Sequence, residues 1–408
     1  MKRLILNLTI FLSTCLALFS VLSPGPVLAQ GEVEVGDSVE IAFPLSVTFK
    51  LSVQSDTPVS DIRLQYTVAQ KSFAQVISEA RPDFSYDSGL AESNWTLDMK
   101  KIGGLPPGTR ITYWWLIEDE SGNTYQTTPR QFTYSDDRYS WRAITDGTIT
   151  LHWYAGSDEL GMELMTATQD ALLRLAGAIG TYPTEPIDLY IYGSSQELQG
   201  AMLFPREWTG GVSYSNLSVI AIGINESNIS WGKSAIAHEL AHLVLYQKTA
   251  NPYNDIPLWF NEGMAMYTQG RVEDYYEDTL RQAVKEGSTI SVQSLCSPFS
   301  VDPEKSYLSY AESYSLVKFL LTTYGQESVS YFLEVLSQGS TYDEALESAF
   351  GFNMGELNDI WLGYLENQYL PQQQSTPPWA IASMAVLSLA LVGIIFVILR
   401  TRGKNRYE

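Results

Sequence analysis

Cysteine and histidine are scarce in this sequence of 408 residues, which contains 2 cysteines and 3 histidines. Cys15 lies in an apolar N-terminal run that we expect to be removed, so Cys296 is the single cysteine of the mature chain. One cysteine cannot form an intrachain disulfide, and the fold must therefore be stabilised by packing.

Positive charge is also in short supply. The sequence has 25 lysines and arginines against 46 aspartates and glutamates, a formal net charge of −21. A surface this acidic repels phosphate backbones and anionic lipids, so we exclude nucleic-acid binding. It could favour cationic substrates, but acidity also simply keeps an exported protein soluble. The charge alone leaves the substrate open.

The N-terminus has the layout of a secretory signal peptide. Lys2 and Arg3 precede an apolar run, which ends in a small-residue cleavage site at Ala29. We therefore expect residues 1–29 to be a signal peptide and the mature chain to begin near Gln30. An uncleaved membrane anchor is the alternative.

A second apolar run lies near the C-terminus. Residues 379–399 are 21 consecutive uncharged residues, enough to cross a hydrocarbon core of about 30 Å, and residues 400–408 add four basic side chains. The positive-inside rule places this tail in the cytoplasm and the preceding domains outside. Residues 370–378 are polar and proline-rich, as in a stalk. We expect a single-pass protein of a prokaryotic cell membrane.

Residues 31–136 are predicted to form a β-sandwich. Short segments alternate apolar and polar residues and are rich in β-branched and aromatic side chains, and turn-forming segments separate them. The run "LPPGTRITYWWLIEDESGNTYQT" resembles an immunoglobulin-like or fibronectin-like module that lacks the cysteine pair of antibody domains.

Residues 140–369 are predicted to form an α+β domain. Strands dominate its first part, including one strand over 210–223, and helices dominate residues 273–369. A helix is expected over 157–180, capped at its N-terminus by Ser157 or Asp158.

The segment "AIAHELAHLVLYQ" carries the chemistry. His238 and His242 are four residues apart, so a helix places both imidazoles on one face, where they can bind one metal ion. Glu239 projects about 100° round the helix from His238, where it can face a water without being a ligand. This spacing predicts two metal ligands and one general base.

A catalytic zinc site usually has three protein ligands. His152 lies in a predicted strand and is expected to be an ordinary strand residue. Glu262, 20 positions after His242 in "PLWFNEGMAMY", is the better third ligand, because this segment begins a second helix that can pack against the first. A charge that merely favours the helix N-terminus is the alternative for Glu262.

The motifs "HELAH" and "WFNEGMA" resemble those of gluzincin zinc metallopeptidases, the thermolysin-like group, and more closely those of the peptidase MA-like metallohydrolases. The resemblance covers about residues 145–365. It implies one Zn²⁺ per chain held by His238, His242 and Glu262. It also implies that peptide bonds are hydrolysed by a zinc-activated water, with Glu239 as general base and proton donor to the leaving amine.

The resemblance leaves three places open. Where thermolysin-like enzymes have an aspartate that supports a zinc histidine, this chain has Met266, so that support must come from elsewhere, such as Asn261 or a backbone carbonyl. Tyr310 is the preferred donor to the oxyanion, with Tyr314 next, although packing can explain either. Residues 210–223 match the edge strand that holds an extended peptide in this family, or are an interior strand.

Two other functions compete with the peptidase. A surface binding protein could keep the domain and its zinc without turnover, but it would have no use for Glu239. A zinc ion that only stabilises the fold is disfavoured, because structural sites generally have four ligands.

Overall fold

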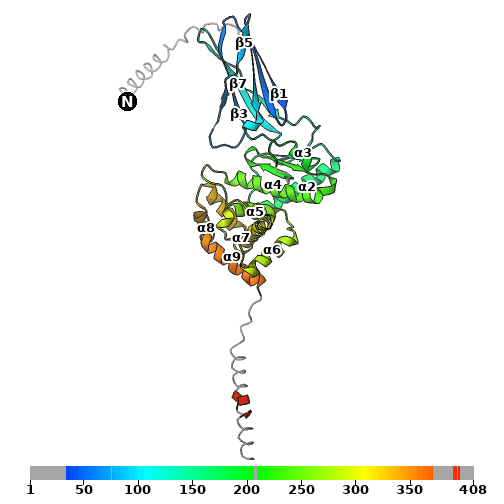
Figure 1. The fold of residues 1–408 in the computed structure, drawn as a ribbon, viewed down its shortest axis with the longest axis vertical. Coiled ribbons are helices and arrows are strands. Elements are labelled where there is room, and N and C mark those ends of the chain that lie inside the picture. Colours follow the sequence, from blue (N-terminus) through cyan, green and yellow to red (C-terminus); the bar gives the residue numbers. More distant parts are fainter. Residues whose placement is uncertain (1–33, 75, 206–208, 371–388, 393, 396–408) are drawn as a thin grey trace, which may run out of the picture.

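The computed structural model describes residues 34–74, 76–205, 209–370, 389–392, 394 and 395. The chain is arranged in three tiers (Figure 1). An N-terminal β-sandwich forms one end, a five-stranded sheet with helices forms the middle, and a helical lobe forms the other end. The sequence predicted an N-terminal β region followed by a region with strands first and helices last, and both are present.

The N-terminal part consists of two antiparallel sheets. One has the order β1-β2-β6-β5, and the other has β4-β3-β7-β8 with β9 also paired to β7. The strands are β1 (Glu34–Ala42), β2 (Ser46–Gln54), β3 (Val59–Val68), β4 (Ser78–Ala80), β5 (Phe84–Asp87), β6 (Leu90–Asp98), β7 (Thr109–Asp119), β8 (Thr124–Gln126) and β9 (Arg130–Tyr134), with a 3-10 turn η1 (Met99–Lys101). Alternate side chains of β2, such as Phe49 and Val53, are buried between the sheets.

The middle tier is a five-stranded sheet of order β10-β11-β12-β14-β13. Its strands are β10 (Arg142–Asp146), β11 (Ile149–Trp153), β12 (Ile187–Tyr192), β13 (Gly211–Tyr214) and β14 (Val219–Gly223). The three central strands are parallel, and the two edge strands, β10 and β13, are antiparallel to their neighbours.

The prediction of one strand over 210–223 is wrong. This segment is a hairpin, in which β13 turns through the short 3-10 helix η2 (Ser215–Leu217) into β14. The reversal is local: Ser218 adopts a left-handed conformation with φ of 56°, and its N–H bonds to the carbonyl of Ser215. As a result, β13 is an edge strand and β14 is an interior strand.

The sheet is buried on both faces. The alternation of side chains is clearest in β12, where Leu189 and Ile191 pack with the helices and Tyr190 and Tyr192 pack with the core of the sandwich. Helices α2 (Asp158–Ile179) and α4 (Ile229–Thr249) cover the first face. The short helix α3 (Ser195–Gln199) and the sandwich cover the second. The sandwich therefore shares a hydrophobic core with the domain that carries "HELAH".

The helical lobe follows α4. It consists of α5 (Leu258–Thr268), α6 (Asp274–Glu286), α7 (Pro303–Ser337), α8 (Tyr342–Phe350) and α9 (Met354–Tyr369), with 3-10 turns η3 (Glu226–Asn228) and η4 (Ser294–Cys296) elsewhere in this half of the chain. Helices α5 and α7 approach closely at Gly263, where an added Cβ would lie 2.2 Å from the backbone oxygen of Ser313. Glycine is required there because any side chain would push the two helices apart.

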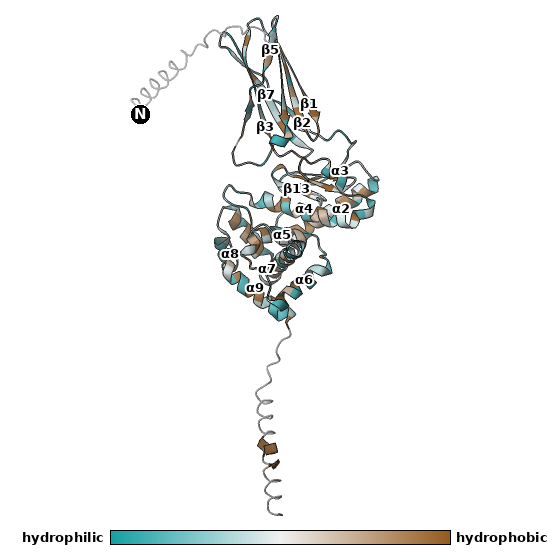
Figure 2. Ribbon diagram, viewed as in Figure 1, coloured by the Kyte–Doolittle hydropathy of each residue, from teal (hydrophilic) through white to brown (hydrophobic). Residues whose placement is uncertain are grey.

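The predicted membrane segments lie largely outside the described residues. The signal peptide, 1–29, and the tail, 400–408, are outside them entirely, and so is the stalk except for Leu370. Of the span 379–399, residues 389–392, 394 and 395 are described; they are helical and hydrophobic (Figure 2). No helix within the described residues has both the length and the apolar character needed to cross a membrane.

Candidate metallopeptidase site

The two histidines of "HELAH" lie near the middle of α4, which follows the interior strand β14. His238 and His242 occupy successive turns, with ring centroids 4.8 Å apart, and their side chains are 20% and 14% exposed. The rest of the helix explains its position. Ile236, Leu240 and Leu243 are buried in the domain core, so the helix is held firmly while the histidines reach a partly open surface.

Glu262 reaches the same point from α5. Its Oε2 lies 3.5 Å from Nε2 of His238 and 3.7 Å from Nε2 of His242. The three ligand atoms all lie within 4.8 Å of one another. Helix α5 is fixed in this position by Trp259 and Phe260, which are fully buried. The second helix predicted from "NEGMAMY" therefore brings its glutamate to the histidine pair.

Both histidines use their other ring nitrogen to contact an amide side chain. His242 Nδ1 lies 2.9 Å from Oδ1 of Asn261, and His238 Nδ1 lies 2.9 Å from the Gln269 amide. An amide can present either its oxygen or its nitrogen by a flip, so both contacts can accept an Nδ1–H. With the proton on Nδ1, the lone pair of Nε2 points toward Glu262, as a metal ligand requires.

The residues present fit a zinc ion. Glu262 Oε2 is buried without a hydrogen-bond partner among the described residues, and its distances to the two Nε2 atoms exceed those of a good hydrogen bond. Two atoms bound to one zinc at about 2.0–2.1 Å in a tetrahedral arrangement are about 3.3 Å apart. A buried carboxylate oxygen converging with two imidazole nitrogens is thus the donor set of a three-ligand zinc site.

The charges of this cluster influence one another. Burial alone would lower the pKa of His238, but the nearby carboxylates of Glu262 and Glu239 outweigh it and raise that pKa. Burial would raise the pKa of Glu262, but the two histidines outweigh it and lower that pKa. The site therefore favours a carboxylate facing a positive charge.

Glu239 points from α4 toward the start of the edge strand. An added Cβ at Gly211 would lie 3.4 Å from Glu239 Oε1, so the first residue of β13 is in contact with this carboxylate. Glu239 is thus beside both the metal-binding cluster and the first residue of the edge strand.

Tyr310, near the start of α7, lies within electrostatic reach of the cluster. Burial raises its pKa to about 12, and the charges of Glu262 and Glu239 add to the rise. Its hydroxyl therefore keeps its proton at neutral pH, and it forms no hydrogen bond with any residue that the structure describes. Tyr314 lies one turn further, where Lys318 stands over its ring at 5.7 Å and burial raises its pKa, with Tyr267 and Glu277 contributing.

The third histidine, His152, is not part of the metal-binding cluster. His152 lies in β11, with Nε2 2.8 Å from Asp188 Oδ1 and its ring stacked on Tyr190 at a centroid distance of 4.3 Å. It does not belong to the group of potential metal ligands found within the described residues.

Gln269 was not anticipated from the sequence. It lies seven residues after Glu262, two helical turns along, so both side chains lie on one face of α5. Met266, between them on that face, is buried and offers no hydrogen-bond acceptor. The i, i+7 spacing was the available signal, and Gln269 acts one turn beyond the position where thermolysin-like enzymes have their aspartate.

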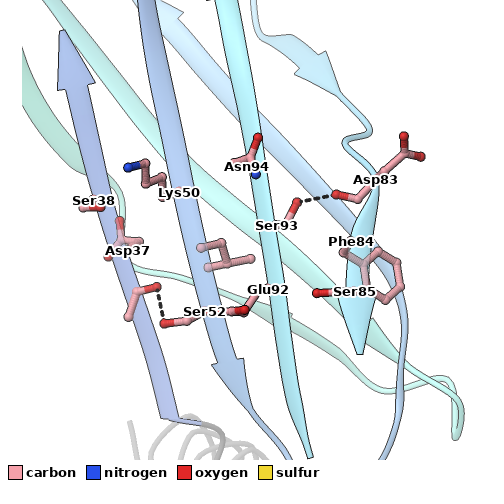
Figure 3. A pocket seen from close by; sticks show the side chains of 12 residues that line it. Asp37, Ser38, Lys50, Ser52, Asp83, Phe84, Ser85, Glu92, Ser93 and Asn94 are labelled. Carbon is pink, nitrogen blue, oxygen red and sulfur yellow. Dashed lines mark hydrogen bonds between the residues drawn. The ribbon is translucent and has the colours of Figure 1, made fainter. Parts of the chain in front are cut away.

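Two hollows on the molecule differ in their position and in the residues that line them. One of about 470 Å³ includes His242 and Asn261 in its lining and so adjoins the metal-binding cluster. A larger one of about 700 Å³ lies across β1, β2, β6 and β5 of the sandwich (Figure 3). There the hydroxyls of Ser52 and Ser93 bond to backbone carbonyls and Lys50 pairs with Glu40, so these three side chains already have partners within the sandwich.

Comparison with solved structures gives only distant likenesses. An aminopeptidase N family protein from Idiomarina loihiensis is similar over 85% of this chain and 73% of its own, with 9% identity and a TM-score of 0.30. OgpA from Akkermansia muciniphila covers 28% of this chain and 32% of its own, with 19% identity and a TM-score of 0.20. No curated protein sequence matches the chain significantly.

A family model matches the part of the chain that carries this site. Residues 166–367 match the Peptidase MA superfamily, and this range contains both histidines of α4 and the glutamate of α5. The match and the converging His-His-Glu donor set agree on one conclusion. Residues 166–367 form a Peptidase MA superfamily domain, in which α4 and α5 carry a metallopeptidase site of the HExxH type.

Proposed function

We propose that this protein is a membrane-anchored, extracytoplasmic zinc metallopeptidase that hydrolyses peptide bonds with Glu239 as general base. The observation that carries the proposal is the buried, unpartnered Oε2 of Glu262, which faces Nε2 of His238 and His242 within the described residues, with Glu239 beside them. A binding site alone has no use for such a base.

His238, His242 and Glu262 would hold a zinc ion, and Asn261 and Gln269 would orient the two imidazoles. A bound zinc ion supplies a Lewis acid that polarises a peptide carbonyl and makes a water molecule more acidic. Glu239 accepts a proton from the water that attacks the carbonyl carbon and passes it to the leaving amine. The Tyr310 hydroxyl, protonated at neutral pH, donates to the oxygen that gains negative charge.

The substrate is an extended peptide that pairs with β13. This strand is an edge of the sheet, so one row of its backbone N–H and C=O groups is available for pairing, and Gly211 brings that row beside Glu239. A peptide added to this edge would pass the general base with its backbone fully extended.

The N-terminal sandwich is proposed to be an immunoglobulin-like module. Its strand order, β1-β2-β6-β5 facing a sheet built on β3 and β7, corresponds to the ABED and CFG sheets of that fold. The signal peptide at 1–29 exports both domains, and the apolar segment 379–399 anchors them in the cell membrane with the basic tail in the cytoplasm.

The test compares the full-length wild type with Glu239→Gln, both kept in a mild detergent. We expect one zinc per chain in both proteins by elemental analysis, and cleavage of a mixed peptide library by the wild type alone. The variant should lose activity by about 10³-fold or more, because proton transfer and orientation of the water are lost together.

The outcomes separate the competing functions. Zinc in both proteins with cleavage by neither would favour a peptidase-like binding protein. Equal cleavage by both would remove Glu239 from its role as base, and absence of zinc from both would contradict the metal site.

A further inference from the structure

The hollow beside His242 has a lining unlike that of the metal-binding cluster. Its volume is about 470 Å³, and it extends from His242 and Asn261 between the second half of α4, the segment before α5, and the start of α8. This size is within the range of ligand-binding pockets. Its lining includes two aromatic rings, Tyr246 and Tyr342, and a single carboxylate, Asp255.

The hollow lies at the end of the edge strand β13, along the path of a peptide paired with that strand. Ser215, at its wall, directly follows the last residue of β13. A peptide paired with this edge strand passes Glu239 at the Gly211 end and approaches the hollow at the Ser215 end. Because side chains of an extended peptide alternate, one of them near the scissile bond can enter the hollow.

The negative charge of Asp255 is not neutralised within the described residues. Asp255 is exposed and forms no ion pair there, and no lysine or arginine lines the hollow. Lys71 lies 6.0 Å from the centre of the Tyr246 ring, but it is paired with Glu185 at 3.4 Å and donates to the Gln247 carbonyl at 3.2 Å.

The carboxylate and the two rings belong to one arrangement. Burial raises the pKa of Tyr246 and of Tyr342, and the charge of Asp255 raises both further, so Asp255 is within electrostatic reach of both hydroxyls. Aromatic walls around a carboxylate suit a side chain with a long apolar stem and a cationic end, because the rings pack on the stem and attract the cation.

We propose that this hollow is the subsite for a lysine or arginine side chain of the peptide, with Asp255 as the residue that determines specificity. The inference rests on the proposed peptidase function and names its substrate class. It also gives the acidic composition of the chain a local meaning, since a basic peptide is attracted to the site at which its side chain is bound.

The experiment uses the zinc-loaded full-length protein and peptides that differ at one position next to the cut site. The library cut sites identify that position, and lysine, its uncharged analogue norleucine, and glutamate are then placed there. We expect the wild type to cleave the lysine peptide with a kcat/KM at least tenfold above the norleucine peptide. This preference should weaken with added salt, because Asp255 is exposed.

Asp255→Asn should lower the ratio of kcat/KM for the lysine and norleucine peptides by about tenfold, and Asp255→Lys should shift preference toward glutamate. Asp146→Asn is the matched control, because Asp146 is an exposed acid at the end of β10, on the opposite edge of the sheet from β13. A ratio unchanged in Asp255→Asn, or lowered equally in Asp146→Asn, would overturn the subsite.

A binding measurement separates failure of this inference from failure of the peptidase function. Glu239→Gln should bind the lysine peptide more tightly than the norleucine peptide, and adding Asp255→Asn should remove the difference. Selective binding without cleavage by the wild type would contradict the peptidase and uphold the subsite. Cleavage with no selectivity in either measurement would do the reverse.

Discussion

The two sides of the five-stranded sheet bury acidic side chains by opposite means. On the sandwich side, Asp136 is 1% exposed and is fully paired. Its two oxygens accept from Nε and Nη2 of Arg138, both at 2.7 Å, and one of them also accepts from the Tyr192 hydroxyl at 3.0 Å. A buried charge with a cation and further hydrogen bonds is tolerated, and here it ties the segment after the sandwich to β12.

On the helical side, Glu312 of α7 is fully buried and has no cation among the described residues. Within the described part of the chain its carboxyl accepts only from the backbone N–H of Ile290, at 3.0 and 3.2 Å, and burial raises its pKa to about 8. Glu262 is different again, because its buried oxygen faces two imidazoles and has no hydrogen-bond partner in the part of the chain that the structure describes. Asp136 is thus neutralised by Arg138, and Glu312 is neutralised by retaining its proton. Glu262 has an oxygen that remains available to bind a metal ion.

Breaking the pair on the sandwich side should have the largest effect on stability. Asp136→Ala leaves the guanidinium of Arg138 and the buried hydroxyl of Tyr192 without their acceptor, and we expect a loss of about 3–5 kcal/mol. Chemical unfolding followed by tryptophan fluorescence measures this loss. The adjacent Asp137→Ala removes an exposed carboxylate and should cost little. Equal losses in the two variants would show that the pair is not what joins the tiers.

Removing the core acid should instead stabilise the protein as the pH rises. The pKa of Glu312 lies above its ordinary value of 4.5, so the native state holds this proton more tightly than the unfolded chain. The stability that this tighter proton binding gives the native state is fully present below about pH 4.5 and is lost as the pH rises to about 8. Glu312→Gln keeps an acceptor for Ile290 and cannot ionise, so the gain over wild type should grow across this range.

At pH 8 we expect the gain from Glu312→Gln to be on the order of 3 kcal/mol, because avoiding the buried carboxylate outweighs the cost of burying the amide. Unfolding midpoints of both proteins between pH 4.5 and about pH 8 measure it. Glu327→Gln, at an exposed position later in α7, is the control. Parallel pH curves for wild type and Glu312→Gln would contradict the raised pKa.

The sequence predicted the elements better than their contacts. Alternation indicated the strands of the N-terminal region, and Ser157 does cap α2 by accepting from the N–H of Leu160. These features depend on neighbours in sequence. The hairpin within 210–223 was missed because the turn between its two strands lacks glycine and proline. Shared burial of Tyr190 and Tyr192 with the sandwich was also invisible, since it depends on residues far apart in the chain.

In the site, too, the residues set by local spacing were predicted, and those set by distant contacts were predicted only in part. His238 and His242 follow from helical spacing alone, and the geometry brings Glu262 to them as the motif indicated. The contact of His242 with Asn261 agrees with one of the two supports that the sequence allowed. The contact of His238 with Gln269 was not predicted, because the corresponding aspartate position of thermolysin-like enzymes is occupied here by Met266. The hollow at Asp255 could not be predicted, since its walls come from α4, the segment before α5, η4 and α8.

The smallest expected effect tests Tyr310, whose hydroxyl lies on the helical side near two carboxylates. Tyr310→Phe keeps the ring that packs on Phe299 at 5.2 Å and removes only the donor, so the fold and bound zinc should be retained. If the hydroxyl donates to the oxyanion, kcat and kcat/KM should fall together by about 10²-fold, or about 2.7 kcal/mol, with KM little changed. Tyr314→Phe, one turn away on the same helix, is the matched control. A fall in kcat for Tyr314→Phe alone would move the donor one turn along α7, and a change confined to KM would make Tyr310 a residue that binds substrate.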